Sequence, residues 1–336
     1  MSKMSTERAR VALNGPTMGT RWSALFFCES GFDPAPARAA LQAAAGEVDA
    51  QMSTWKPDSD LMRMNAAPPG LWVNLPPALM RVLAKGLEIG RASNGAFDIG
   101  LGDLTNAWGF GPQAADTGAI RAHLGQGRPP AHDVLELDAV RCRARKHGNL
   151  QLDLSGIAKG YGVDRMMAVI ERFGIASALV GLDGELRAKG VRADGRPWAV
   201  AIEKPDYEMR APISVLTLQD AAVATSGDYR HWVDAGRVRL SHTMDARTGG
   251  PLNNHVASVT VLADTCMEAD AWATALMVMG EAAGIAFADA RGLNALYILR
   301  TKSGLAQRPV GAVGDQRRQA VGQQLIELAQ EIWTAG

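Results

Sequence analysis

The sequence of 336 residues has no excess of charge of either sign, because 35 lysines and arginines are matched by 35 aspartates and glutamates. A protein that binds nucleic acid through bulk charge needs a basic excess or stripe, so this class is excluded. Long apolar runs are also missing: the longest apolar helical run, 271–280, is about half of what a bilayer span requires. We therefore expect neither a nucleic-acid partner nor a membrane span.

Cysteine is scarce as well. Cys28, Cys142 and Cys266 are odd in number and widely spaced, which indicates neither a disulfide framework nor a pair of metal ligands. The first ten residues are polar and basic, without the apolar core and small-residue cleavage site of a secretory signal. These absences favour a reduced, cytoplasmic location.

The remaining composition, 47% hydrophobic and 21% charged, is typical of a globular protein. Helical patterns alternate with strand patterns but do not follow a βαβ repeat, so we expect an α+β fold in one compact unit. Helices are predicted at 34–51, 76–92, 266–279 and 319–333, and a further one is predicted to begin with Ser155 as its cap. Strands are predicted at 20–28, 134–137, 150–154, 178–182, 185–188, 198–202, 213–218, 256–262 and 295–299.

The helix at 266–279 carries the most informative local pattern. Asp270 and Thr274 lie four residues apart among apolar neighbours, so both project from one face of the helix. A carboxylate in such surroundings must be paired, protonated or bound to a metal. One carboxylate and one hydroxyl, completed by phosphate and water oxygens, suit a hard cation such as Mg²⁺. On the helix alone, an ion pair between Asp270 and an arginine is the commoner explanation.

The segment 152–161 (LDLSGIAKGY) combines two glycines with a predicted strand-to-helix turn. Amides exposed at a helix start, reinforced by Lys159, are suited to binding a phosphate. The glycine spacing matches neither a Walker motif nor a dinucleotide-binding fingerprint. Asp153 and Ser155 are equally consistent with local backbone hydrogen bonds and a helix cap.

Two aromatic segments and one histidine complete the candidates. The segments 95–98 (GAFD) and 106–111 (NAWGFG) could shape a flat pocket for a ring system or simply pack in the core, and Trp55, in a polar turn, could stack on a ligand. His242 lies within six residues of an aspartate and an arginine and could act as a general base near neutral pH, although a lone histidine is more often structural.

Seven segments in order resemble the ApbE family, the FAD:protein FMN transferases. They are 17–20 (TMGT), 52–59 (MSTWKPDS), 95–98 with 108–112, 153–161, 224–229 (ATSGDY), 242–249 (HTMDARTG) and 266–280. The resemblance implies an α+β unit of mixed, mainly antiparallel sheets with flanking helices, which we expect over 11–300, and a C-terminal extension over 301–336. It also implies Mg²⁺-dependent cleavage of FAD, with transfer of FMN to a threonine of an acceptor flavoprotein and release of AMP.

Carried onto this chain, the resemblance implies a set of site residues. The FAD pocket would be lined by Met18, Trp55, Ala96, Phe97, Asp98, Ser155, Tyr161 and Met244. The metal would be held by the backbone carbonyl of Ala158 and the side chains of Asp270 and Thr274. His242 would be the catalytic base, with Asp245 as a group that orients it.

The chain departs from the family pattern at three places. Trp55 stands where the family usually has a tyrosine, and 181–184 reads GLDG where Asn-Ile-Gly-Gly is usual. The export signal of most bacterial members is not seen, so the acceptor is expected to be a cytoplasmic flavoprotein or a cytoplasmic-facing domain. Two other functions fit the same residues: a metal-dependent FAD pyrophosphatase that yields FMN and AMP, and a flavin-binding protein without catalysis.

Overall fold

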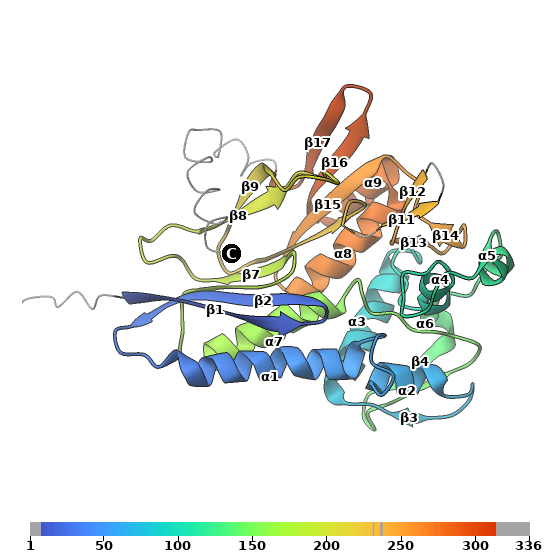
Figure 1. Ribbon diagram of the computed structural model, residues 1–336, viewed down its shortest axis with the longest axis horizontal. Helices are drawn as coiled ribbons and strands as arrows, with labels where there is room; N and C mark the ends of the chain where they lie inside the picture. The colour runs from blue at the N-terminus through green and yellow to red at the C-terminus, as the bar shows by residue number, and fades with distance from the viewer. Residues whose placement is uncertain (1–7, 231, 236–237, 314–336) are drawn as a thin grey trace, which may run out of the picture.

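The computed structural model describes residues 8–230, 232–235 and 238–313, and its main element is an antiparallel sheet (Figure 1). The sheet has eight strands in the order β1-β2-β6-β7-β10-β15-β16-β17, and every neighbouring pair is antiparallel. Its strands are β1 (Arg8–Thr17), β2 (Thr20–Glu29), β6 (Ala178–Leu182), β7 (Glu185–Lys189), β10 (Ala222–Gly227), β15 (Val256–Ala263), β16 (Asn294–Thr301) and β17 (Gly304–Val310).

Four helices accompany this sheet: α1 (Pro34–Met52), α7 (Ala158–Arg172), α8 (Cys266–Met279) and α9 (Glu281–Arg291). Helices α1 and α7 lie side by side along the β1–β2 end, and α8 packs on β10 and β15 (Figure 1). The core at the first end includes the fully buried Trp22 and Phe26 of β2, Leu41 of α1 and Met166 of α7. Burying such side chains is worth roughly 1.5–3 kcal/mol each, so this contact fixes α7 against the sheet.

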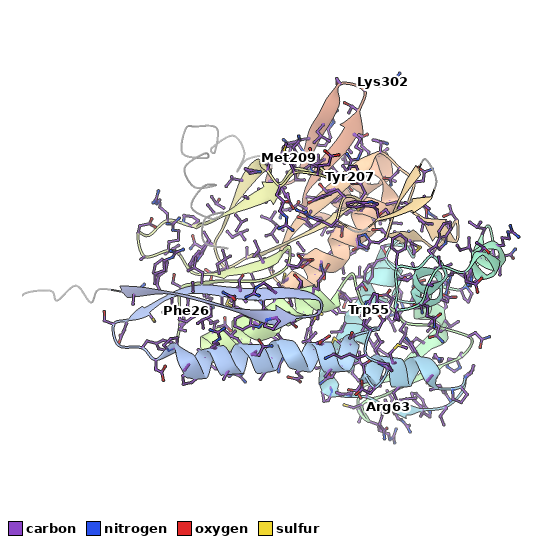
Figure 2. The ribbon with its side chains drawn as sticks, viewed as in Figure 1. Phe26, Trp55, Arg63, Tyr207, Met209 and Lys302 are labelled. Atoms are coloured by element: carbon purple, nitrogen blue, oxygen red, sulfur yellow. The ribbon has the colours of Figure 1, made fainter. Side chains whose placement is uncertain are left out.

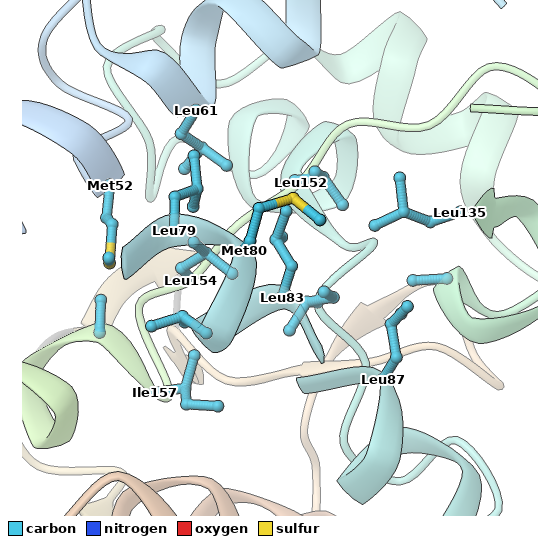
Figure 3. Close-up of a cluster of buried hydrophobic side chains, with 14 of the residues drawn as sticks. Met52, Leu61, Leu79, Met80, Leu83, Leu87, Leu135, Leu152, Leu154 and Ile157 are labelled. Carbon is cyan, nitrogen blue, oxygen red and sulfur yellow. The ribbon is translucent and has the colours of Figure 1, made fainter. Parts of the chain in front are cut away.

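A smaller, mainly helical part follows α1. It contains α2 (Asp60–Ala66), β3 (Val73–Asn74), α3 (Pro77–Ala92), α4 (Gly102–Ala107), α5 (Thr117–His123), α6 (Ala131–Val134), β4 (Leu135–Asp138) and β5 (Arg143–Lys146). The three short strands pair in the order β3-β5-β4. Its core is rich in leucine and includes Leu152, Leu154 and Ile157, which lie just before α7 (Figure 3). These three side chains anchor the segment that leads into α7.

Three two-stranded sheets complete the described chain. They pair β8 (Trp198–Glu203) with β9 (Pro212–Leu218), β11 (Trp232–Ala235) with β12 (Val238–Ser241), and β13 (Met244–Asp245) with β14 (Gly250–Pro251). In the parts of the chain that the structure describes, no helix is long and apolar enough to span a bilayer.

The expected fold class, a mixed α+β unit with mainly antiparallel sheets, is confirmed. The helices predicted at 34–51, 76–92 and 266–279, and the strand at 178–182, match α1, α3, α8 and β6 within one residue at each end. Strand β17 falls in the stretch expected to be a C-terminal extension, yet it belongs to the main sheet. The helix predicted at 319–333 lies outside the described residues, and the expected cytoplasmic location stays a prediction.

The strand predicted at 150–154 is wrong, because the backbone of this segment is not paired with another strand. The buried side chain of Asn65 takes the place of a partner: its Oδ1 accepts from Leu152 N at 2.7 Å, and its Nδ2 donates to Leu152 O at 2.9 Å. The helix cap predicted at Ser155 is also wrong. Helix α7 begins at Ala158, and Ser155 Oγ lies 2.5 Å from Asp153 Oδ1 instead.

Candidate active site

A deep cleft of about 2130 Å³ brings most of the predicted site residues together. It is lined by segments of β2, the end of α1, the loop after α3, the start of α7, β7, β8, β10, the 242–244 segment and α8. Predicted residues that line it are Met18, Trp55, Ala96, Phe97, Asp98, Ser155, Ala158, His242, Met244, Asp270 and Thr274. Ligand pockets of roughly 300–1,000 Å³ are usual, so this cleft has room for more than one small ligand.

Two predicted residues do not line the cleft. Tyr161 is buried within the core of the smaller part, where burial raises the pKa of its hydroxyl. Asp245 accepts hydrogen bonds from Arg247, at 2.9 Å from Nε to Oδ1 and at 2.8 Å from Nη2 to Oδ2. The roles expected for Tyr161 in FAD binding and for Asp245 beside His242 stay predictions.

Met18 reaches the cleft from the turn between β1 and β2. The turn consists of Met18 and Gly19, whose φ angles are 45° and 71°. A two-residue hairpin of type I′ requires a positive φ at both central residues, which is unusual for a residue with a side chain. Met18 lines the cleft from this turn.

Trp55 lies in the turn after α1 (Figure 2). The turn is held by Ser53 and Ser59, since Ser53 Oγ accepts from Trp55 N at 3.2 Å and Ser59 Oγ donates to the Ser53 carbonyl at 2.7 Å. The Trp55 side chain is 65% exposed although it lines the cleft. A large aromatic ring held at a cleft rim without burial is well placed to stack on a planar ligand.

Phe97 and Asp98 follow the end of α3 and are fixed by local hydrogen bonds. Phe97 N donates to Ser93 Oγ at 3.1 Å, and Asp98 Oδ1 accepts from Gly100 N at 2.8 Å and Ala131 N at 3.1 Å. Burial raises the pKa of the Asp98 carboxyl despite these hydrogen bonds. Asp98 thus holds the loop in place through these hydrogen bonds and also lines the cleft.

The start of α7 packs closely against the face of α8 that carries Asp270 and Thr274. A methyl group on Gly156 would lie only 3.0 Å from Thr274 Oγ1, and one on Gly160 would lie 2.8 Å from Asp270 Cβ. Gly160 N donates to Asp270 Oδ2 at 3.0 Å. The two glycines therefore allow the turn that contains Ala158 to lie against this face of α8.

Asp164, a residue that sequence analysis missed, fixes the two helices relative to each other. Its carboxylate accepts from the amides of Cys266 and Met267 at the start of α8, both at 2.9 Å, and from Arg187 Nη1 at 2.6 Å. A carboxylate at a helix start complements the unpaired amides and the helix dipole. Asp164 lies four residues after Gly160, on the same face of α7. This spacing is the feature of the sequence from which its contact with α8 could have been predicted.

The oxygen ligands expected for a metal fit this part of the cleft. Burial and the neighbouring charge of Glu185 raise the pKa of Asp270 to about 8, although Lys159 opposes the shift. The buried carboxyl groups of Asp270 and Glu185 share one ammonium group, that of Lys159, whose other contact, Asp183, is exposed. Two buried carboxyl groups with one cation between them are suited to a divalent cation at Asp270.

The other two ligands expected for the metal, the Thr274 hydroxyl and the Ala158 carbonyl, are uncharged. Thr274 Oγ1 lies 3.0 Å from Ser226 Oγ, and Ala158 lines the cleft. Among the described residues, no group of three or more His, Cys, Asp and Glu side chains is arranged to hold a metal. A site made of one carboxylate, one hydroxyl and one carbonyl requires no such group, and hard oxygen donors of this kind suit Mg²⁺ better than Zn²⁺.

His242 lines the cleft from the segment before β13. Its ring makes an edge contact with Phe110, with the ring centroids 6.4 Å apart. His242 and Thr274 thus lie on the same cleft, although they come from different elements.

A glycine-flanked helix start, a buried carboxylate, hydroxyl groups and a histidine in one deep cleft define an enzyme-like site for a phosphate-containing ligand. Comparison with known proteins identifies the family: the ApbE family model matches residues 18–297. The FAD:protein FMN transferase of Vibrio cholerae is 37% identical over 307 residues, covering 89% of this chain and 90% of that protein. The Escherichia coli K12 protein of the same name is 34% identical over 302 residues, covering 88% and 85%. The chain belongs to the ApbE family.

Solved structures agree with this assignment. Flavin transferase ApbE from Vibrio cholerae matches with a TM-score of 0.82 at 34% identity, covering 92% of this chain and 100% of that one. The apo form of the flavinyl transferase ApbE from Pseudomonas stutzeri matches with a TM-score of 0.81 at 34% identity, covering 92% and 97%. The family resemblance seen in the sequence is confirmed.

Proposed function

We propose that this protein is a Mg²⁺-dependent FAD:protein FMN transferase that moves FMN from FAD to a threonine hydroxyl of an acceptor flavoprotein. The main observation in support is that the 156–160 turn contacts Asp270 and Thr274 of α8. His242 lines the same cleft. Family membership supports it, because relatives at 33–37% identity bear this name.

FAD would occupy the cleft with its rings against the apolar and aromatic lining and its pyrophosphate toward the start of α7. The proposed FAD contacts that line the cleft are Met18, Trp55, Ala96, Phe97, Asp98, Ser155 and Met244. The start of α7 is suited to the anionic part of FAD because its amides and dipole favour negative charge.

Mg²⁺ would be held by Asp270, Thr274 and the Ala158 carbonyl, where it would neutralise charge on the pyrophosphate. This placement agrees with the excess of carboxylates around Asp270. Asp164 and the Gly160 amide keep the ligand-bearing faces of α7 and α8 together.

The proposed transfer forms one bond and breaks one. The threonine oxygen forms a bond to the FMN phosphorus, and the bond from that phosphorus to the bridging oxygen breaks, releasing AMP with the electron pair. His242 accepts the threonine proton, because a hydroxyl is a poor nucleophile at neutral pH without a base. The Phe110 ring contacts the imidazole at its edge. Positioning and electrostatics supply most of the acceleration in phosphoryl transfer.

Mass spectrometry of an acceptor flavoprotein incubated with the protein, FAD and Mg²⁺ tests the proposal. We expect the acceptor to gain the mass of FMN on a threonine, with AMP released in equal amount, and we expect a chelator to prevent both. A threonine-to-alanine acceptor variant is the matched control. FMN and AMP formed without an adduct on any acceptor offered would instead assign an FAD pyrophosphatase, and intact FAD bound without turnover would leave a flavin-binding protein.

A further inference from the structure

The floor of the cleft contains an ion pair to which the proposed chemistry gives no role. Lys159 Nζ lies 2.8 Å from Glu185 Oε1 and 3.4 Å from Asp183 Oδ2, and all three residues line the cleft. Glu185 is only 2% exposed, and its second oxygen, Oε2, has no hydrogen-bond partner in the described chain. The pair joins the first turn of α7 to the start of β7.

Stability does not explain this arrangement. Removing two charges from water is costly, and a buried ion pair is often no more stabilising than apolar groups of the same size. A buried carboxylate oxygen without a partner adds a further desolvation penalty. Features that disfavour folding and lie in a cleft are typical of functional sites.

Lys159 lies among acidic groups at the start of α7. Its ammonium group lies between the carboxylates of Glu185 and Asp183. Lys159 follows Ala158 directly and precedes Gly160, whose amide binds Asp270. Its side chain is 30% exposed and lines the cleft, while Glu185 remains buried.

Resting on the proposed function, we propose that Lys159 binds the pyrophosphate of FAD directly and that Glu185 is the positioning residue that holds its ammonium group at the cleft floor. The ammonium group balances the negative charge of the two phosphates in FAD and of the departing AMP. Glu185 acts only through Lys159. The three donor hydrogens of an ammonium group allow it to contact Glu185 and a phosphate oxygen at the same time.

Equilibrium binding of FAD in the presence of a chelator tests this without catalysis. Lys159→Met should weaken FAD binding about 10- to 100-fold, the value of a hydrogen bond to a charged group. Riboflavin has the same ring system and no phosphate, so its affinity should be unchanged in this variant. Equal losses for FAD and riboflavin would overturn the proposal, because they would indicate a general disturbance of the cleft.

A double-variant comparison separates phosphate binding from structural charge balance. Glu185→Gln should weaken FAD binding by a smaller factor, and Lys159→Met with Glu185→Gln should bind FAD as weakly as Lys159→Met alone. If the pair only balances charge, the double variant should regain the affinity of the unmodified protein, and the proposal is overturned. Lys159→Arg should restore part of the affinity, since a guanidinium group also binds phosphate.

Lys189→Met is the matched control, because Lys189 forms a similar pair with Glu171, at 3.0 Å, between exposed side chains. It should leave FAD binding unchanged. Measurements on the unmodified protein distinguish a failure of the proposed function from a failure of the role proposed for Lys159. If it fails to bind FAD or to modify any acceptor, the proposed function is wrong; if it does both and Lys159→Met binds FAD normally, only the role of Lys159 is wrong.

Discussion

The backbone amide of Gly160 donates a hydrogen bond to Asp270 Oδ2 at 3.0 Å, joining the first turn of α7 to the middle of α8. Gly160 leaves no room for a side chain, since a methyl group there would overlap the carbonyl oxygen of Cys266. Gly160→Ala should therefore push the two helices apart and lower the free energy of unfolding by roughly 1–3 kcal/mol. Chemical denaturation measures this.

Gly162→Ala in the same helix is the control for that experiment. A methyl group at Gly162 meets only side chains, the nearest being Leu182 Cδ1 at 3.3 Å. Alanine is favoured over glycine inside a helix by about 1 kcal/mol, so this variant should be as stable as the unmodified protein or more so. Equal destabilisation of the two variants would show that close packing on α8 is not what Gly160 provides.

Much of the fold could be predicted because local patterns agree with the final structure. The apolar run at 266–279 predicted α8, and the short apolar run at 178–182 predicted β6. Strand β1 was missed because its first residues are exposed on both faces, so no period-2 alternation is visible there. The segment 150–154 was assigned wrongly because Asn65, 87 residues away in sequence, replaces the expected partner strand.

Only the features of the site that lie within a single helix or strand could be predicted from local sequence patterns. The spacing of Asp270 and Thr274 predicted one shared face, but the helix alone favoured a structural ion pair. The partners of Asp270 come from elsewhere: the Gly160 amide lies 110 residues earlier, and Glu185 belongs to β7. Such contacts depend on tertiary packing, which no local pattern records. The prediction that Asp270 binds a metal came from the family resemblance and not from the local sequence pattern.

The raised pKa of Asp270 predicts how Mg²⁺ binding depends on pH. In the metal-free protein the carboxyl holds its proton up to pH about 8, and a cation must displace that proton. The affinity for Mg²⁺ should thus fall up to about tenfold for each pH unit below 8. Isothermal calorimetry at pH 6, 7 and 8 measures it. An affinity that does not change across this range would contradict the burial argument.

The same shift has a consequence for the stability of the metal-free protein. Because the folded state binds the Asp270 proton more tightly than the unfolded state, stability from this group falls as pH rises from 3.8 to about 8. Asp270→Asn should remove this contribution, and thermal unfolding should then depend less on pH. Mg²⁺ should raise the melting temperature of the unmodified protein most at pH 8 and leave Asp270→Asn unaffected.

Asp164 should stabilise the contact between α7 and α8. Its two amide contacts to α8 and its ion pair with Arg187 are lost together in Asp164→Ala, which should cost about 3 kcal/mol. Asp194→Ala removes an exposed pair with Arg196 and should cost less than about 1 kcal/mol. Urea denaturation of both variants measures the difference, and similar losses would refute the role of Asp164 in joining the helices.

His242→Asn should separate binding from catalysis. Removing a general base lowers turnover by about 10²- to 10⁴-fold, while FAD affinity should stay within a factor of about two because asparagine keeps a polar group on the cleft. Transfer rates by mass spectrometry and flavin fluorescence titrations provide the two measurements. His255→Asn is the control, since His255 pairs with Glu281 at 2.7 Å and does not line the cleft. A matching fall in FAD affinity would assign His242 to binding instead.

Trp55 should contribute to FAD binding through stacking alone, because its ring is 65% exposed and lines the cleft. Loss of one stacked aromatic costs about 1–3 kcal/mol, so Trp55→Ala should weaken FAD binding about 5- to 150-fold, and Trp55→Tyr should keep most of the affinity. Trp72→Ala is the control, since Trp72 packs beneath Arg143 and Arg145 and does not line the cleft.

The product ratio of the same variants tests whether Trp55 also excludes water. A smaller ring at the rim should admit more water, so Trp55→Ala should form more free FMN relative to modified acceptor than the unmodified protein does. Trp55→Tyr should lie between the two, because tyrosine covers less of the rim and adds a hydroxyl group. Chromatography of free flavin and mass spectrometry of the acceptor give the ratio. An identical ratio in all three proteins would limit Trp55 to stacking on FAD.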